Sequence, residues 1–492
     1  MPVEHMDRLT AIDTSFLAQE REGSHMHIGA IFQFEGPAPA REDFTEQIES
    51  RLHLVPRYRQ KLVFPRFEMG RPLWVDDPRF NVDYHVRHTA LPAPGGIEQL
   101  RLLAARIFSQ QLDRSKPLWE MWLIEGMEDG RFALINKTHH SLVDGVSGVD
   151  LTAVLFDAEP VPSKIEPPAK EWTPHPEPSD AEIVAAGVKG LLRTPLDVAE
   201  RTVKAVQNPN ATIEEAREAA EGVGEVAWGV INRAPETPLN VPIGPHRRIW
   251  WLRTELAELK GIKNALGGTV NDVFLAAVTG ALARWLRTRG VRTEGLELRG
   301  CVPVSVRAET EHGDLGNKIT MMACLLPVYA DDPLQRYAIV SDAMKGLKES
   351  KQALGAEAIT GIQEFAPPTL FARASRLNFS SRVYNVLVTN VPGPQFPLYL
   401  LGRELQEFVP MPFLAPEKAL AIAIFSYNGK VDIGLMGDYD AMADLDVFGG
   451  YLEDAITELR VLAEERAPDG PRTQRAGATG TGSNGSAAKT RT

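Results

Sequence analysis

Residues 132–145 read FALINKTHHSLVDG, an alternating apolar run that ends in two histidines and an Asp-Gly pair. In a β-strand, successive side chains point to opposite faces. One face would carry Phe132, Leu134, Asn136, Thr138 and His140, and the other Ala133, Ile135, Lys137 and His139. The two histidines are therefore predicted to point in opposite directions, so that only one of them can face a given site.

The sequence before this strand alternates helical and strand patterns. Apolar residues recur at helical spacing in residues 40–53 and again in residues 97–110. Residues 121–125 and 131–139 have the composition of two strands, and Asp129-Gly130 between them is a typical hairpin turn. This order of elements predicts an α/β fold.

The chain divides into four predicted parts. Residues 1–158 form a first α/β half that carries the histidine pair. Seven prolines between Pro160 and Pro178 predict an extended linker, which continues as a helical crossover to residue 245. Residues 246–465 begin with a strand near Ile249 and form a second α/β half, whereas residues 466–492 lack apolar periodicity and are predicted to be a disordered tail. A cleft between the two halves is the expected substrate site.

Composition and charge narrow the class of protein. The net charge is −12, from 53 Lys+Arg against 65 Asp+Glu, and this balance argues against a nucleic-acid partner. Two cysteines, Cys301 and Cys324, cannot form a disulfide framework, and the N-terminus lacks a signal-peptide pattern, so a cytoplasmic location is expected. The longest apolar run, Val270 to Leu286, is interrupted by polar residues. Any membrane contact is therefore predicted to be peripheral.

His140 is the candidate for acid–base chemistry. An imidazole near its ordinary pKa can take a proton from an alcohol at neutral pH. Asp144, beside Gly145, could orient the loop that follows the strand.

Three alternatives compete with this interpretation. A His-His-x-x-x-Asp segment could bind a metal, but adjacent strand histidines diverge and no compact set of further ligands lies nearby in the sequence. Ser141 could be a nucleophile, although the chain contains no G-x-S-x-G elbow. His140 could also be a buried histidine held by a hydrogen bond. Its place at a strand end before Asp-Gly favours chemistry over this last alternative.

Several motifs together resemble a known family. Residues 139–145 match the HHxxxDG signature of the CoA-dependent acyltransferase superfamily, which includes chloramphenicol acetyltransferase-like enzymes and the condensation domains of peptide synthetases. Further motifs resemble those of the bacterial wax ester synthase/diacylglycerol acyltransferase family, in the family's order and over roughly residues 8–465. They are Asp13-x-Ser15-Phe16-Leu17, Met26-His27-Ile28-Gly29, Pro117-Leu118-Trp119, Asn271-Asp272, Pro303-Val304-Ser305-x-Arg307, Gly316-Asn317 and Asn390-Val391-Pro392-Gly393-Pro394.

The resemblance implies two chloramphenicol acetyltransferase-like subdomains with a central tunnel, and transfer of a long-chain acyl group from acyl-CoA to diacylglycerol. Wax ester synthesis from a long-chain alcohol is the close second, and no residue decides between the two acceptors. Acyl-CoA is a co-substrate, and no bound cofactor or metal is expected. His140 would deprotonate the acceptor hydroxyl, which attacks the thioester directly without an acyl-enzyme intermediate.

The resemblance also suggests roles for the residues around His140. His139 would support the motif and Gly145 would be structural. Asp144 would orient the motif by pairing with an arginine, for which Arg307 is the candidate by motif alone.

The remaining motif residues carry two interpretations each. The amide of Asn271 could donate to a developing oxyanion, or Asn271 could be a helix N-cap. Asp272 is expected to be structural or capping. Pro117-Leu118-Trp119 could line the substrate path, but a tryptophan before a buried strand is more often part of the core.

Two functions from other classes remain open at this stage. One is an acyltransferase that takes its acyl group from a carrier protein, and the other is a non-catalytic protein of lipid surfaces. A peripheral contact with a membrane or lipid droplet is a further hypothesis, for which Arg373, Arg376 and Arg382 near apolar side chains suggest a surface.

Overall fold

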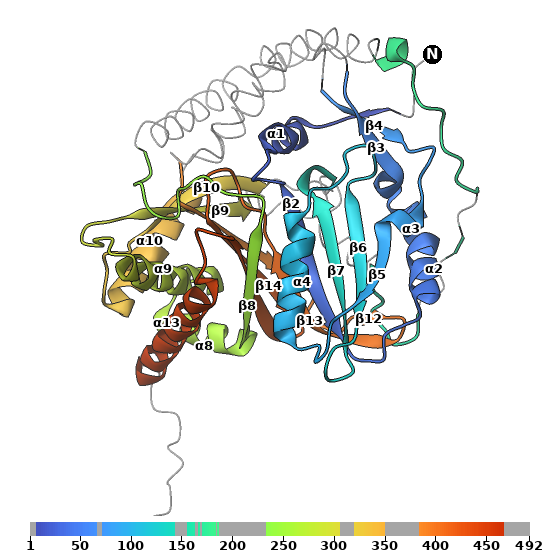
Figure 1. Ribbon diagram of the computed structural model, residues 1–492. Helices are drawn as coiled ribbons and strands as arrows, with labels where there is room; N and C mark the ends of the chain where they lie inside the picture. Colours follow the sequence, from blue (N-terminus) through green and yellow to red (C-terminus); the bar gives the residue numbers. More distant parts are fainter. Residues whose placement is uncertain are drawn as a thin grey trace, which may run out of the picture.

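The computed structural model describes residues 6–65, 71–142, 155–162, 166–167, 170–183, 185, 233–305, 319–349 and 383–466. Two six-stranded sheets lie side by side in this part of the chain (Figure 1). A three-stranded sheet has the order β1-β4-β3, with the bounds Asp7–Arg8, Leu73–Asp76 and Gln60–Val63.

The first six-stranded sheet has the order β12-β13-β2-β7-β6-β5. These strands span Tyr399–Leu400, Arg403–Met411, His27–Phe34, Phe132–His139, Trp119–Glu125 and Val86–Ala90. The helices of this half are α1 (Ala11–Gln19), α2 (Arg41–Arg51), α3 (Val82–His85) and α4 (Ile97–Ser109). The predicted hairpin is confirmed, because β6 and β7 pair antiparallel and Gly130 between them has a φ of 76°, which glycine adopts easily.

The second sheet has the order β10-β9-β11-β14-β15-β8. These strands span Ile319–Leu326, Leu298–Ser305, Val386–Pro392, Leu420–Tyr427, Lys430–Asp438 and Arg247–Glu255. Among the described residues, the helices that accompany it are α8 (Leu256–Leu266), α9 (Val270–Thr288), α10 (Pro333–Glu349) and α13 (Leu445–Arg466). Both halves are therefore α/β, as the sequence predicts, and the strand expected near Ile249 is β8.

The chain exchanges strands between the halves. β13 leaves the second half of the sequence and pairs antiparallel with β2, with Met411 opposite Gly29. β12 joins the same sheet, and Tyr399 exchanges two backbone hydrogen bonds of 2.8 Å with Asp157. The domain limits 1–158, 159–245, 246–465 and 466–492 stay a prediction, but hydrogen bonding assigns residues 399–411 to the first sheet.

A buried ion pair fixes the point where the chain leaves the first half. Arg51 Nη2 lies 2.8 Å from Asp157 Oδ1, and both side chains are 3% exposed. Replacing Asp157 by alanine leaves a buried guanidinium without this carboxylate, so we expect a loss of about 3–5 kcal/mol in stability. The measurement is the urea midpoint of unfolding. The exposed pair Arg41–Asp83 is the matched control, and Asp83→Ala should cost less than about 1 kcal/mol; equal losses would show that burial of the first pair does not matter.

A shared hydrophobic cluster joins the two sheets. Ile31 and Ile135 of the first sheet belong to the same cluster as Trp251, Ala421 and Met436 of the second. Arg101 on α4 strengthens this junction, because its guanidinium lies 3.4 Å from the ring centroid of Trp250 and donates to the Trp251 carbonyl at 3.1 Å. The halves therefore pack as one body around the junction.

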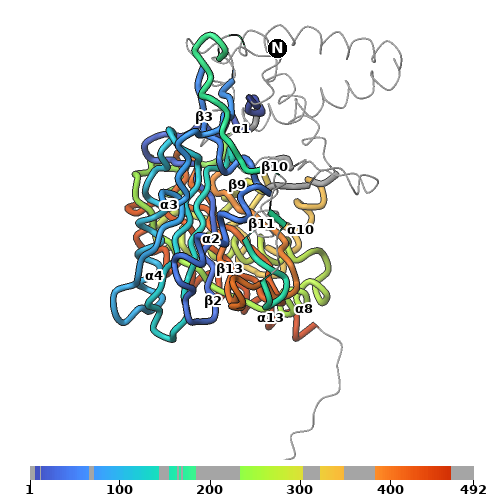
Figure 2. The backbone as a smooth tube through the Cα atoms, turned by 90° about the vertical axis from the view of Figure 1, so that its right-hand side faces the viewer, coloured from blue at the N-terminus to red at the C-terminus, as the bar shows by residue number. Residues whose placement is uncertain are grey.

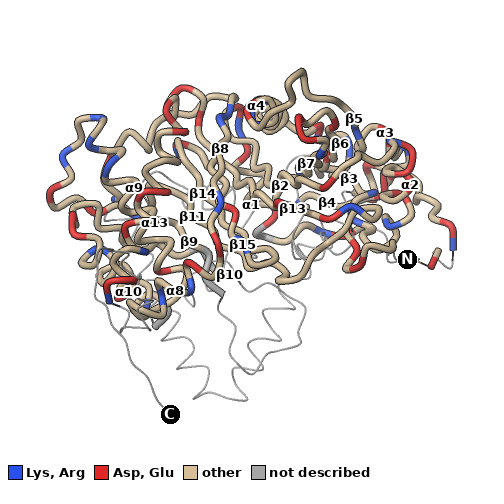
Figure 3. The backbone as a smooth tube through the Cα atoms, turned by 90° about the horizontal axis from the view of Figure 1, so that it is seen from below, with Lys and Arg blue, Asp and Glu red and all other residues tan. Residues whose placement is uncertain are grey.

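The apolar helices and the charged side chains of the described residues bear on contacts with membranes and other partners. No single helix among them is long and apolar enough to cross a membrane; α8 and α9 pass that test only as a pair bent by 94°. Most of α9 is buried among the helices and sheet of the second half, which explains its apolar composition. Seen from below, Lys/Arg and Asp/Glu positions are interspersed along the backbone (Figure 3).

Candidate active site

The histidine pair lies where β7 ends and meets α1. His139 is the last residue of β7, opposite His27 of β2, and His140 begins a short 3-10 helix, η4 (His140–Leu142). α1 packs against η4. Figures 1 and 2 both place α1 at the same end of the molecule as β3. The sheet register therefore fixes the first histidine, and α1 covers the second.

His140 is held by its backbone and by two aromatic rings. Its N–H donates to the carbonyl of Met26 at 3.0 Å. Met26 is buried and has a φ of 50°, an uncommon conformation for a residue with a side chain. The His140 ring stacks on Phe16 of α1 at 3.9 Å and meets Phe413 edge-on at 5.6 Å. His140 is only partly buried, so its imidazole can still meet a substrate.

His139 has different surroundings and is 1% exposed. Its Nδ1 accepts the backbone N–H of Ser141 at 3.1 Å and lies 2.7 Å from Ser141 Oγ. Because Nδ1 is an acceptor, the proton of the neutral ring lies on Nε2. Burial lowers the pKa of His139 to about 3, so the ring stays neutral. The two rings contact different residues, in agreement with the alternation in the sequence.

A buried carboxylate lies next to His139. Glu20, directly after α1, has a side chain that is 1% exposed, with Oε2 3.7 Å from His139 Nε2. Arg114 Nε donates to Glu20 at 2.7 Å, and Gln111 donates at 2.8 Å. His27 Nε2 lies 3.9 Å from the same carboxylate. Two imidazoles and a carboxylate thus meet, yet the described residues form no group of three that could hold a metal ion.

Lys137, on the face of β7 that carries His139, fixes the sheet to α4. Its side chain is 0% exposed and its Nζ donates to the carbonyls of Ile107 at 2.9 Å and Gln110 at 2.7 Å. Both carbonyls lie at the C-terminal end of α4, where a cation is favourable. Burial lowers the pKa of Lys137 to about 8. Lys137 is thus a structural residue beneath the histidine pair.

The buried histidines predict a loss of stability in acid. Burial lowers the pKa of His139 from 6.5 to about 3 and that of His27 well below 6.5. The unfolded chain therefore binds protons below about pH 6.5 that the folded protein cannot accept, which costs about 1.4 kcal/mol per pH unit for each histidine. Above that pH the two residues contribute no pH dependence.

The test compares the urea midpoints of wild type and His139→Gln at about pH 7.5 and about pH 5.5. When the pH is lowered from the higher to the lower value, the variant should lose less stability than the wild type. This holds whether or not the variant is less stable than the wild type at the higher pH. An identical pH dependence in both proteins would contradict the assignment.

The structure describes some of the predicted site residues, whereas others lie outside its described part. His139 and His140 lie together where β7 ends, and Met26, Phe16 and Phe413 contact His140. Asp144, Gly145 and Arg307 lie outside the described residues, so their pairing stays a prediction, as does the arginine surface at Arg373, Arg376 and Arg382.

Asn271 lies in the first turn of α9. The N-cap of α9 is Thr269, and Asp272 completes a capping box with it by accepting the Thr269 N–H at 2.8 Å. The alternative interpretation of Asn271 as the N-cap is therefore wrong. Asn271 Oδ1 instead accepts from Asn390 Nδ2 of β11 at 3.4 Å, and no described residue accepts a hydrogen bond from the Asn271 amide NH₂. Oxyanion support by Asn271 stays a prediction.

Pro117, Leu118 and Trp119 lie in the core of the first half. Leu118 and Trp119 are 0% exposed, and the Trp119 indole donates to the Tyr58 carbonyl at 2.8 Å. The carbonyl of Leu118 accepts the N–H of His139 at 3.0 Å. These contacts favour the structural interpretation over the predicted substrate contact.

Sequence reasoning missed Glu20, Arg114 and Phe413. Phe16 was quoted only as part of a motif, and no local pattern marks the other three residues. Glu20 directly follows the motif-bearing helix, which is the one signal the sequence offers. The contacts of Arg114 and Phe413 depend on tertiary packing.

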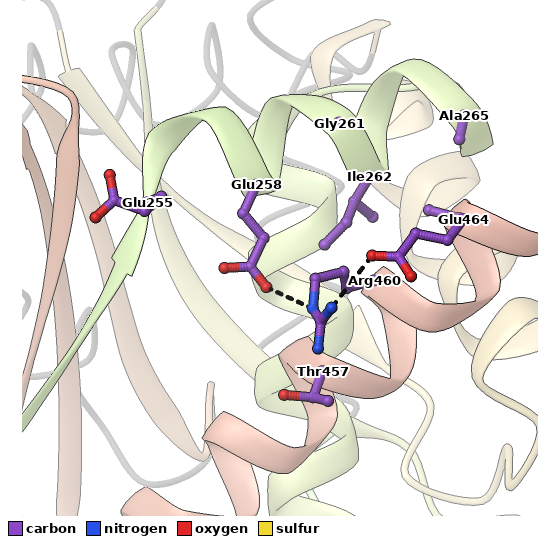
Figure 4. Close-up of a pocket in the computed structure, with 9 residues that line it drawn as sticks. Glu255, Glu258, Gly261, Ile262, Ala265, Thr457, Arg460 and Glu464 are labelled. Carbon is purple, nitrogen blue, oxygen red and sulfur yellow. Dashed lines mark hydrogen bonds and ion pairs between the residues drawn. The ribbon is translucent and has the colours of Figure 1, made fainter. Parts of the chain in front are cut away.

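A groove of about 620 Å³ lies between α8 and α13, away from the histidine pair (Figure 4). Arg460 crosses it and pairs with Glu258 and Glu464, each at 3.1 Å. Three of the four charged residues that line the groove thus pair with one another, and none of the site residues above lines it.

Comparisons with known proteins show the family of the chain. Residues 9–274 match the wax ester synthase/diacylglycerol acyltransferase catalytic domain, and residues 315–460 match the C-terminal domain of the same family. A probable diacylglycerol O-acyltransferase of Mycobacterium tuberculosis is 32% identical over 465 residues, covering 94% of this chain and 97% of that protein. A second such protein of the same organism is 30% identical, with 92% and 99% covered.

Solved structures show the same fold. The wax ester synthase/diacylglycerol acyltransferase from Marinobacter aquaeolei superposes with a TM-score of 0.64 at 26% identity, covering 93% of this chain and all of that one. The first condensation domain of the CDA synthetase has a TM-score of 0.55 at 17% identity, with 95% and 98% covered, and shares the fold.

Proposed function

Because the chain belongs to the wax ester synthase/diacylglycerol acyltransferase family, it is an O-acyltransferase, and we propose that it transfers a long-chain acyl group from acyl-CoA to diacylglycerol. The product is triacylglycerol. The names of the Mycobacterium tuberculosis relatives support diacylglycerol as acceptor, and the name of the Marinobacter enzyme supports a long-chain alcohol as the second acceptor.

The contrast between the two histidines is the observation that carries this proposal. His139 is buried, neutral and occupied at Nδ1 by Ser141. His140 is partly exposed, and its ring is held between Phe16 of the first half and Phe413 of the segment that crosses from the second. A base at the junction of two halves can meet a donor and an acceptor together.

In the proposed mechanism, the neutral His140 imidazole takes the proton of the acceptor hydroxyl while the oxygen attacks the thioester carbonyl. A C–O bond forms and the carbonyl becomes a tetrahedral oxyanion, to which the Asn271 amide donates. The C–S bond then breaks, and the imidazolium returns the proton to the CoA thiolate. No covalent enzyme intermediate forms.

The test is an ester-synthesis assay with the full-length purified protein and palmitoyl-CoA. Diacylglycerol and hexadecanol are offered separately, and carrier-protein-bound palmitate replaces the CoA thioester in a parallel reaction. Triacylglycerol formed from the CoA donor supports the proposal, and the acceptor ratio ranks the two activities. Product from the carrier-bound donor alone would overturn the choice of donor. No ester with either donor would reject the enzymatic function.

The apolar acceptor suggests where the reaction takes place. We propose that the enzyme works in the cytoplasm against the inner face of the membrane or a lipid droplet. The arginines Arg373, Arg376 and Arg382 are the candidates for contact with anionic headgroups. The fraction of protein that floats with anionic vesicles should decrease when the three arginines are replaced by glutamate. An unchanged fraction would show that these residues do not contact the membrane.

A further inference from the structure

Glu20 is a buried carboxylate that has no role in the proposed mechanism. Its side chain is 1% exposed, and burying a charge is unfavourable unless strong partners surround it. Arg114 supplies the positive partner, and it also donates to the carbonyl of Leu17 at 3.3 Å. This pair therefore has a fixed place at the end of α1.

The carboxylate faces the ring of the first histidine. Glu20 Oε2 lies 3.7 Å from His139 Nε2, the nitrogen that carries the proton because Nδ1 accepts from Ser141. This separation is longer than a hydrogen bond, so the interaction is an electrostatic one between a carboxylate and an N–H dipole. Among the described residues, Glu20 supplies the only carboxylate within 4 Å of the His139 ring.

One helix thus contacts both histidines. Phe16 of α1 stacks on His140 at 3.9 Å, and Glu20, the C-cap residue directly after α1, faces His139. The backbone N–H of Glu20 donates to the carbonyl of Phe16 at 3.1 Å, which ties the two contacts together. His140 lies in the chain between His139 and Ser141. These two neighbours are joined to each other, because His139 Nδ1 lies 2.7 Å from Ser141 Oγ and accepts the Ser141 backbone N–H at 3.1 Å. A shift of His139 or of α1 would therefore move the His140 ring.

We propose that Glu20, neutralised by Arg114, is a positioning residue that acts through His139 and α1 to hold the His140 imidazole in its reactive orientation. It touches no substrate. This inference rests on the proposed role of His140, and it assigns the pair Glu20–Arg114 to the machinery of the reaction rather than to stability alone.

The electrostatic surroundings make the proposal testable by pH. Among the described residues, the other charged or titratable groups that interact with His27 and His139 are His25, Lys137 on β7 and Arg247 on β8. None of these groups is an acid. Removing the Glu20 charge should therefore lower the pKa of His140, since Arg114 is left unbalanced, and removing the Arg114 charge should raise it.

The experiment measures kcat, KM and the pH profile of kcat/KM for the full-length protein with palmitoyl-CoA and diacylglycerol. Glu20→Gln keeps the shape and removes the charge. A misplacement of about 1 Å can cost about 10²-fold in rate, so we expect kcat to fall by roughly 10- to 100-fold with KM nearly unchanged. The acidic limb of the profile should move to lower pH by about 0.5 units, and in Arg114→Gln it should move to higher pH.

Three comparisons keep the result decisive. Glu22→Gln removes the same charge from an exposed position two residues further on and should behave as wild type. Glu20→Asp keeps the charge and should retain the wild-type limb with an intermediate kcat. If circular dichroism shows that Glu20→Gln does not fold, the test is the acidic limb of the pH profile of Arg114→Gln, which must move to higher pH.

A kcat within about twofold of wild type in Glu20→Gln, or limbs that do not move in opposite directions, would overturn the positioning role. If activity is lost but the acidic limbs of the pH profiles do not move, the Glu20–Arg114 pair has a structural role only. An inactive wild type would instead reject the proposed function, so the two failures can be told apart.

Discussion

Replacing His140 by alanine is expected to lower kcat by roughly 10²–10⁴-fold, the contribution of a well-placed general base. The substitution should lower kcat and leave KM nearly unchanged, because the base accepts the proton in the transition state and contributes little to substrate binding. The fold should survive, since the ring is only partly buried and the backbone bond of residue 140 to Met26 does not need a side chain.

Two controls make this result specific. His246→Ala removes an exposed histidine whose ring lies 6.2 Å from Tyr439, and it should keep wild-type activity. The melting temperatures of both variants should stay close to that of the wild type. If His140→Ala keeps its full rate with a folded protein, His140 is not the base and the contrast between the two histidines has another origin.

Asn271→Ala carries the second largest expected effect. Loss of one donor to an oxyanion costs about 10²–10³-fold in kcat. The contact with Asn390 uses the amide oxygen of Asn271, so the proposed donor is its NH₂ group. Because Thr269 is the N-cap, the substitution removes no cap and should change stability little.

The neighbouring Asp272→Ala separates chemistry from helix structure. It deletes one half of the capping box on α9 and should cost about 1 kcal/mol of stability. Measuring kcat and the urea midpoint for both variants gives a crossed pattern, with kcat falling mainly in Asn271→Ala and the midpoint mainly in Asp272→Ala. A loss of stability without a loss of kcat in Asn271→Ala would contradict its role at the oxyanion.

Features that depend on neighbours in the chain were predictable. The hairpin at Asp129-Gly130 follows from a turn that favours glycine, and the strand that ends at His139 follows from a period of two. The motif order identified the family, and matches over residues 9–274 and 315–460 confirm it. Local sequence also contained the capping box: Asp272 has the expected capping role, and Thr269 rather than Asn271 is the N-cap.

By itself, the sequence determined the two α/β halves, the place of the histidine pair at the end of a strand and the family, since each depends on local periodicity or on motifs a few residues long. Only the tertiary structure decided that β13 crosses into the first sheet, with Met411 opposite Gly29. It also decided that Glu20, Arg114 and Phe413 surround the two histidines. Such contacts join residues up to hundreds of positions apart, and they are chosen by the packing of whole faces and by the pairing of buried charges, which no local pattern encodes.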